Sequence, residues 1–194
     1  MTLQSLIRPN RIAATRREHL TTLPGDERIP NAAGSLTYGI TVRCKRSQLW
    51  PWLIQMGADR AGWYSYDAVD NGGRPSADRI VPELQSPQVG AVFPALPGMR
   101  DGFVLVESEP PDWMVLDWPG PDGQSVVTWA FLLHAIDEHN TRLVVRVRAS
   151  DRYRFRGLPK PIGLWVVRAI HAIMERKQLV EIAKRAEATA NRSA

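Results

Sequence analysis

The chain has 194 residues, of which 44% are apolar, and it carries a formal net charge of +5 at pH 7. This length is typical of one domain, and the apolar share is sufficient for a real hydrophobic core. The single cysteine excludes an internal disulfide framework, and the N-terminus lacks the apolar stretch of a secretory signal, so we expect a cytoplasmic protein.

The charge is unevenly distributed along the chain. Basic residues outnumber acidic ones in residues 1–30 and 151–194, whereas residues 31–150 are slightly acidic. No helix-turn-helix, zinc-finger or RNA-recognition signature accompanies the basic ends, so no nucleic-acid partner is expected. Basic termini are compatible with peripheral contact to an anionic membrane, and equally with a solvated helix face and tail.

The N-terminal part divides at about residue 30. Residues 1–30 are polar and predict an arm laid over the domain or partly disordered, with a helix near residues 12–20 that Pro24 and Gly25 must end. Residues 31–190 are expected to form a single domain. Its first strand covers residues 36–43, where apolar and polar side chains alternate.

Residues 49–67 are the part of the chain richest in aromatic, turn and ionisable side chains. The apolar spacing predicts a short helix with Ser47 as N-cap, Pro51 in its first turn and Gly57 at its end. An irregular connection follows, and residues 66–71 predict a second short helix that ends at Gly72. Such a connection can aim aromatic side chains with polar tips at a common site.

The second half of the chain has the pattern of an antiparallel meander. Strands are predicted near residues 91–94, 103–107, 113–118, 126–136 and 143–149, separated by turn-forming segments. In the last of them, Arg142, Arg146 and Arg148 alternate with apolar residues, which predicts a solvent-exposed arginine face. The strand before it is apolar on both faces, so other elements must cover both of its sides.

A long C-terminal helix is predicted from about Pro161 to Ala188. Its second half is amphipathic. Residues 162–174 are apolar around nearly the whole helix, yet too few to span a bilayer. This half is expected to be buried on all sides, with a cavity or a membrane surface as the alternative partners.

The segments WPWLIQMGADRAGWYSYDAVDN and SADRIVPELQ resemble the helix and loop of an uncharacterised branch of the polyketide cyclase / START-like (SRPBCC) superfamily. The resemblance covers residues 25–188. It implies an α+β helix-grip fold, in which a curved antiparallel sheet of about six or seven strands surrounds a long C-terminal helix and two short helices follow the first strand. The superfamily includes lipid carriers, hormone receptors, cyclases and proteins of unknown role, so the resemblance predicts a fold rather than a reaction.

No pattern for a metal or a cofactor is present. The four histidines are scattered and Cys44 stands alone, so no metal site is expected, and no glycine-rich phosphate loop occurs. Ser65 does not lie in a GxSxG elbow. His134 and His171, each within an apolar run, are interpreted as core or rim residues, and Cys44 as a small packed residue rather than a nucleophile.

The leading functional hypothesis is the binding of a hydrophobic or aromatic small molecule, lipid-like or polyketide-like, in a cavity between the sheet and the C-terminal helix. Candidate ligand contacts combine aromatic walls with neutral hydrogen-bonding groups. They are Trp52, Gln55, Trp63, Tyr64, Tyr66, Asn71, Trp118, Trp129, Phe131, Trp165, Ala169 and Ile173.

Two alternatives belong to other classes of function. In a cyclase or dehydratase, Arg60 holds a ligand carboxylate or enolate oxygen while Tyr64 or Asp67 assists a proton transfer in the cavity. The competing interpretation of these residues is that arginine and aspartate side chains only lock the irregular connection. A structural or membrane-adjacent interaction role is the other alternative, and the sequence leaves the oligomeric state open.

Overall fold

The alternating segments form strands of one antiparallel sheet in the computed structural model, which describes residues 12–154 and 160–192, the latter by backbone alone at 160–165 and 167. Within these residues the sheet has six strands in the order β1-β6-β5-β4-β3-β2. They are β1 (Gly34–Val42), β2 (Val92–Pro94), β3 (Gly102–Glu109), β4 (Trp113–Pro119), β5 (Ser125–Ala135) and β6 (Thr141–Ala149). The two longest ladders join β6 to β1 and to β5, with Val145 opposite Tyr38 and Phe131.

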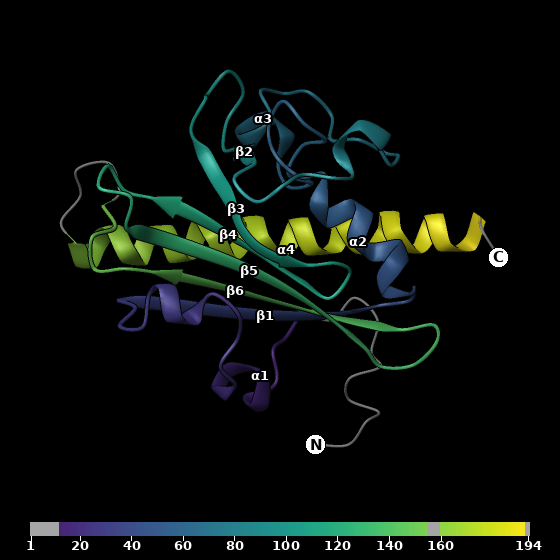
Figure 1. Ribbon diagram of the computed structural model, residues 1–194, viewed down its shortest axis with the longest axis horizontal. Helices are drawn as coiled ribbons and strands as arrows, with labels where there is room; N and C mark the ends of the chain where they lie inside the picture. The colour runs from purple at the N-terminus through teal and green to yellow at the C-terminus, as the bar shows by residue number, and fades with distance from the viewer. Residues whose placement is uncertain (1–11, 155–159, 193–194) are drawn as a thin grey trace.

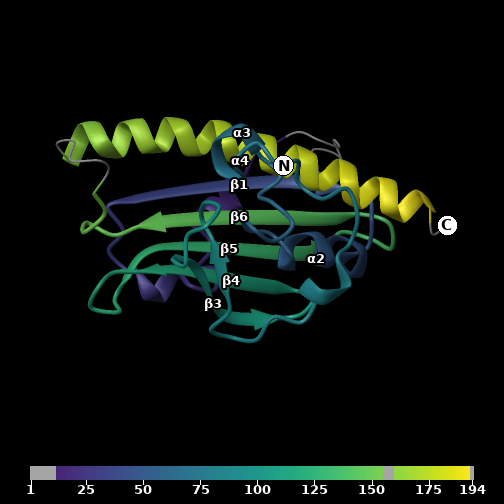
Figure 2. The same cartoon turned by 90° about the horizontal axis from the view of Figure 1, so that it is seen from above.

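One long helix, α4 (Lys160–Arg192), runs along the sheet in both views (Figures 1 and 2). The shorter helices are α1 (Arg16–Leu20), α2 (Arg46–Ile54) and α3 (Asp67–Asp70), with single turns η2 (Asp26–Arg28) and η3 (Pro82–Leu84). This order of elements is the predicted α+β helix-grip fold, with α2 and α3 as the two short helices after β1. No helix in the described part of the chain has the length and apolar character needed to cross a membrane.

Helix α2 starts two residues earlier than predicted. Its N-cap is Lys45 rather than Ser47, and the Gln48 side chain accepts a hydrogen bond from the Lys45 backbone N–H at 3.0 Å. Pro51 therefore lies inside the helix and not in its first turn. The helix holds its place through burial, because Leu49, Trp52 and the residues beside them are enclosed in the core.

The core lies between the sheet and one face of α4. Leu143, Val145 and Val147 of β6 belong to it together with Leu179 and Ile182 of α4. A smaller apolar cluster covers the opposite face of the sheet, formed by Leu23, Val115, Ala130, Leu132 and Val144. Both sides of β5 are thus covered, as its apolar sequence requires.

The arginine face of β6 is buried, so the prediction that it is solvent-exposed is wrong. The Arg146 side chain is 4% exposed, and its Nη1 lies 2.6 Å from Oδ2 of Asp26 and 2.8 Å from the carbonyl of Thr21. Arg142 donates from Nε to Glu18 at 2.8 Å. Burying an arginine requires a complete set of acceptors, and residues 12–30 supply them.

Residues 12–30 lie on the side of the sheet away from α4. Glu18 both pairs with Arg142 and completes a capping box with Thr15 at the start of α1. Arg148 donates to the carbonyl of Ile29 at 2.8 Å. The acidic and carbonyl groups of this segment thus attach it to β6, and Arg28 attaches it to β4 through Asp117 at 3.0 Å.

Candidate functional site

A pocket of about 260 Å³ opens between the sheet, α4 and the irregular segment that joins α2 to β3. In Figures 1 and 2 this segment, which contains α3 and β2, lies beside α4. Hydrogen bonds with α4 hold it there, among them one from Nε2 of Gln178 to the carbonyl of Trp63 at 2.8 Å and one from Oγ of Ser65 to the carbonyl of Met174 at 3.1 Å. The pocket volume lies just below the range of about 300–1,000 Å³ typical of small-molecule sites.

One wall of the pocket is aromatic. Trp63 and Trp129 stack with ring centroids 5.4 Å apart, and Phe103 meets Trp129 edge to face at 5.2 Å. The Trp63 indole N–H donates to the carbonyl of Pro94 at 3.1 Å, which fixes the ring. Tyr153 also lines the pocket, so the wall is largely apolar and comes from the loop after α2, from β3 and β5, and from the segment after β6.

The opposite wall is the polar face of α4. His171, Glu175 and Gln178 line the pocket at positions i, i+4 and i+7, a spacing that places all three on one face of a helix. Nε2 of His171 lies 3.6 Å from Oε2 of Glu175, too far for a hydrogen bond. Both Glu175 carboxyl oxygens and the Gln178 side-chain carbonyl oxygen have no hydrogen-bond partner among the described residues.

Burial sets the protonation of this wall. The Glu175 side chain is 1% exposed, and desolvation raises its pKa to about 8, so its carboxyl group holds a proton at pH 7. Desolvation lowers the pKa of His171 to about 4 although part of its ring borders the open volume of the pocket. At neutral pH the pocket therefore presents an uncharged acid beside an uncharged imidazole.

A second carboxyl group, Asp70 of α3, also lines the pocket. It is 5% exposed, and within the described part of the chain its oxygens accept no hydrogen bond of good geometry, although the Ser65 hydroxyl and the backbone N–H groups of Tyr66 and Asp70 lie near enough to favour its charged form. Burial, followed by the charge of Asp67, raises the pKa of Asp70 to about 6. Asp70 is thus largely ionised at neutral pH and makes the pocket acidic rather than basic.

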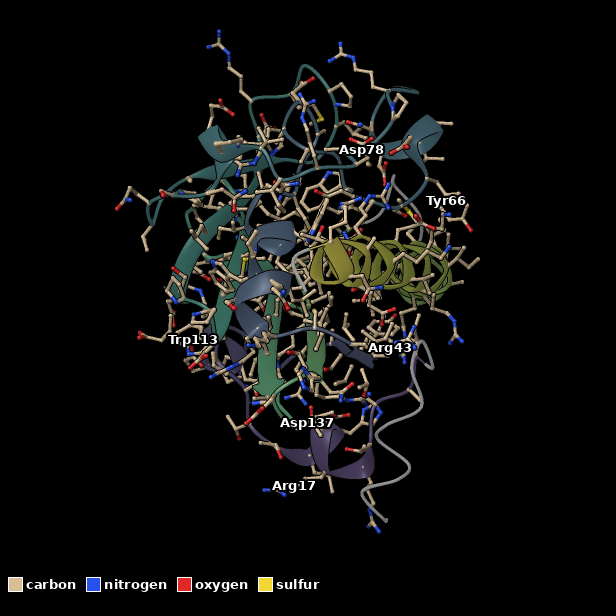
Figure 3. All side chains as sticks on the ribbon, turned by 90° about the vertical axis from the view of Figure 1, so that its right-hand side faces the viewer. Arg17, Arg43, Tyr66, Asp78, Trp113 and Asp137 are labelled. Carbon is tan, nitrogen blue, oxygen red and sulfur yellow. The ribbon has the colours of Figure 1, made fainter. Side chains whose placement is uncertain are left out.

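Two of the twelve predicted ligand contacts, Trp63 and Trp129, line this pocket. The aromatic residues Trp52 and Phe131 are wholly buried in the core instead, and Trp118 packs edge to face on Phe103. Tyr66 is 44% exposed and points outward from the segment above α4 (Figure 3).

On α4, Ile173 is 58% exposed and Ala169 is also exposed, whereas His171 and Met174 face the pocket. The expectation that residues 162–174 are buried on all sides is therefore wrong for the C-terminal part of this range, residues 168–174. The side chain of Trp165 lies outside the described residues. The pocket-facing stripe of α4 is offset by one residue from the predicted one.

The three predicted catalytic residues, Arg60, Tyr64 and Asp67, do not line the pocket. The Arg60 guanidinium donates to the carbonyls of Met56 and Ile54 at 2.8 and 2.9 Å and so caps the C-terminal end of α2. The Arg60 Cζ atom lies 4.4 Å from the centroid of the Phe93 ring. Burial lowers the pKa of the Arg60 guanidinium. Two of the five N–H donors of Arg60 are thus used at the end of α2, and the side chain does not reach the pocket.

Tyr64 and Asp67 belong to a polar lock of the irregular segment. Gln55, which is 0% exposed, donates from Nε2 to the Tyr64 hydroxyl at 2.6 Å and accepts from the backbone N–H of Val81 at 2.9 Å. Asp67 accepts from the Ser76 hydroxyl at 2.6 Å. Asn71 similarly bonds within the segment, to the carbonyl of Arg74. The segment is thus locked by hydrogen bonds centred on Gln55, rather than by the predicted arginine–aspartate pairs.

The lock predicts a strong effect of Gly62. Its φ is +80°, and a Cβ there would lie 2.3 Å from Oγ and 2.9 Å from Cα of Ser76. We expect Gly62→Ala to lower the free energy of unfolding by about 2 kcal/mol, measured by urea denaturation. Gly73→Ala is the matched control, since its φ is +77° with no atom within 4 Å of the added methyl, and an equal loss in both variants would contradict the clash.

The polar residues of the pocket were missed by the sequence analysis, which treated His171 as an isolated core or rim residue. The available signal was the spacing of His171, Glu175 and Gln178, three polar residues on one face within an apolar helix. The other isolated histidine, His134, is exposed at the end of β5. A buried polar stripe on an apolar helix indicates a functional cavity more directly than the aromatic-rich loop does.

Two further side-chain sets show no reactive arrangement in the described residues. No group of three or more His, Cys, Asp or Glu side chains there is placed to bind a metal ion. Cys44 is buried, and burial together with the charge of Glu187 raises the pKa of its thiol to about 12. The thiol is thus unreactive, as a packed residue would be.

No protein-family model and no curated protein sequence matches this chain. Solved structures with a similar fold include a protein from Mesorhizobium loti, with 13% identity over 83% of this chain and 99% of that one and a TM-score of 0.45. The Zhui aromatase/cyclase from Streptomyces sp. R1128 is 11% identical over 79% of this chain and 93% of its own, with a TM-score of 0.41. A polyketide-cyclase-like protein from Corynebacterium glutamicum is 17% identical over 82% and 83% of the two chains, with a TM-score of 0.35. At these identities the likeness concerns the fold alone.

Proposed function

We propose that the chain binds a small apolar or aromatic molecule in the pocket between the sheet and α4. The observation that carries this proposal is an aromatic-walled pocket in which several polar lining atoms, among them both Glu175 oxygens, have no protein partner in the described residues. Buried polar atoms without partners cost free energy, and a ligand that supplies the missing hydrogen bonds removes that cost. The volume favours a compact ring system over a long acyl chain.

The proposal predicts binding of a neutral aromatic probe such as N-phenyl-1-naphthylamine. Because Trp63 and Trp129 line the pocket, binding should quench their fluorescence and saturate at one probe per chain. Met174→Trp places a larger side chain in the pocket and should weaken binding by about tenfold or more, which corresponds to about 1.4 kcal/mol.

Ile173→Trp is the matched control, because it adds the same side chain at the neighbouring, exposed position of α4. The affinity of this variant for the probe should stay within about twofold of that of the unsubstituted protein. Equal weakening by both variants, or quenching that does not saturate, would argue against binding in this pocket. Native mass spectrometry of protein purified gently from its own host should show a stoichiometric small-molecule adduct and so provide the natural ligand.

An enzyme of the cyclase or dehydratase kind is the second candidate, favoured by the 3.6 Å approach of His171 to Glu175. An uncharged acid beside an uncharged imidazole is a suitable pair for moving a proton to and from a bound molecule. In this candidate Glu175 is the acid and His171 the base, in place of Arg60, Tyr64 and Asp67. Incubation of the identified ligand with the protein should then change its mass or its isotope content in deuterated water.

A further inference from the structure

The polar atoms left without partners in the pocket are predominantly acceptors. They comprise both carboxyl oxygens of Glu175 and of Asp70 and the carbonyl oxygen of Gln178, whose Nε2 already donates to Trp63. The Trp129 indole N–H is the opposing donor, and Nδ1 of His171 can take either role. Protonated Glu175 offers one O–H donor of its own, but once it is ionised, a ligand that completes the lining formed by the described residues must mainly supply N–H or O–H groups.

The charges around the pocket also favour a positively charged group. No lysine or arginine is among its described lining residues, which include two carboxyl groups. A ligand carboxylate would therefore be placed next to Asp70 without a compensating cation, an unfavourable arrangement at low dielectric. The aromatic wall acts in the same direction, because the faces of indole rings attract cations.

Glu175 is the group best placed to pair with such a cation. It is 2% exposed, it lines the pocket, and His171 on its own helix lies too far away for a hydrogen bond. From β1, Tyr38 stacks on His171 and its hydroxyl also has no partner in the described residues. Arg168 and Arg176 are exposed, so neither neutralises the Glu175 carboxylate inside the pocket.

We propose that the ligand of this pocket is a hydrophobic amine, bound with its ring system on the Trp63–Trp129 wall and its ammonium group donating to Glu175 and Gln178. This inference rests on the proposed function, because it requires that the pocket binds a small apolar molecule at all. Asp70 adds negative potential from the α3 side. The amine supplies several N–H donors on one atom, which a neutral alcohol or a carboxylate does not.

The test compares ligands that share one ring system, 2-naphthylmethylamine, 2-naphthalenemethanol and 2-naphthoate, by calorimetry at pH 7 and low salt. The amine is expected to bind at least about tenfold more tightly than the alcohol, and the carboxylate most weakly. If the alcohol binds as tightly as the amine, or the carboxylate more tightly, the amine inference is overturned and pocket binding stands. If none of the three binds, the proposed function falls as well.

Glu175→Gln separates a specific ammonium site from general attraction to a mildly acidic pocket. Affinity for the amine should fall to that for the alcohol, whereas affinity for the alcohol should stay within about twofold. Glu109→Gln, at the exposed end of β3, is the control and should change neither value. A preference for the amine that survives Glu175→Gln would overturn the assignment.

Proton exchange gives an independent readout. Because Glu175 is protonated in the empty pocket at pH 7, its pairing with an ammonium ion must release about one proton, which calorimetry in phosphate and in Tris buffers detects. Affinity for the amine should rise by nearly tenfold per pH unit between about pH 6 and 7.5, with no such rise in Glu175→Gln. Binding without proton release would contradict an ion pair at Glu175.

Discussion

Replacing Arg146 by alanine is expected to lower the free energy of unfolding by about 3–5 kcal/mol, because the change leaves a buried acceptor set without its cation. The Arg146 side chain is 4% exposed and bonds to Asp26, to the carbonyls of Thr21 and Glu18, and from Nε to the Thr37 hydroxyl at 3.1 Å. Urea denaturation followed by tryptophan fluorescence measures the loss.

Arg43→Ala is the control for an exposed ion pair. The Arg43 side chain is 63% exposed and pairs with Glu187 at 3.2 Å, so its loss should cost under about 1 kcal/mol. Combining Arg146→Ala with Asp26→Ala should cost less than the sum of the two single changes, since each alone leaves the other residue unpaired. A loss for Arg146→Ala as small as that for Arg43→Ala would show that the segment of residues 12–30 contributes little to stability.

Glu175→Gln is expected to stabilise the protein, by up to about 3 kcal/mol at pH 7. The folded protein holds the Glu175 proton up to about pH 8, whereas the unfolded chain releases it near 4.5. Stability therefore falls as the pH rises through this window, and an uncharged amide removes that fall. The same change that abolishes the proposed amine preference should thus raise the urea midpoint at neutral pH.

His171 acts in the opposite direction at lower pH. Its pKa is about 4 in the folded protein and 6.5 in the unfolded chain, so its contribution to stability is lost as the pH falls through that range. Between about pH 4.5 and 6.5 the effects of Glu175 and His171 on the free energy of unfolding change with pH in opposite directions and largely cancel. Between about pH 6.5 and 8 only the fall caused by Glu175 remains. The difference between the original protein and Glu175→Gln isolates Glu175, and a difference that does not grow from pH 4.5 to 8 would contradict a protonated buried carboxyl.

Glu181→Gln provides a control of opposite sign on the same helix. Burial alone would raise the pKa of Glu181, but hydrogen bonds from Lys184, Arg185 and Lys177 bring this pKa down to about 2. Its charged form is thus stabilised in the folded protein, and its removal should lower stability at neutral pH. Stabilisation by both changes would indicate a general charge effect.

The sheet and α4 were predictable because their side-chain periods are regular. The alternation on β6 correctly identified Leu143, Val145 and Val147 as core residues, and the apolar stripe of α4 did the same for Leu179 and Ile182. The opposite face of β6 was predicted wrongly for a physical reason. Arginines face water unless acceptors cover them, and here the acceptors lie more than 100 positions earlier in the chain.

The site was less predictable because backbone geometry decides where loop side chains point. Asp59 and Tyr64 both adopt positive φ, of 57° and 58°, which turns the chain sharply on either side of Arg60. Arg60 is thereby directed to the end of α2 and Tyr64 to Gln55, away from the pocket. Residue types alone contain no information on these turns, whereas the regular spacing of His171, Glu175 and Gln178 was readable.

The attachment of residues 12–30 to β6 has a consequence for the order in which the chain folds. This segment is synthesised first, yet its acceptors pair with arginines 118 to 129 positions later, after every other strand has been made. Until β6 joins the sheet, these acceptors lack their cations and the segment has only its contacts with the other strands, such as that of Arg28 with Asp117. Until the segment docks, the arginine row of β6 stays hydrated. We therefore expect complete docking of the N-terminal segment only after β6 has joined the sheet, in keeping with the slow formation of long-range contacts.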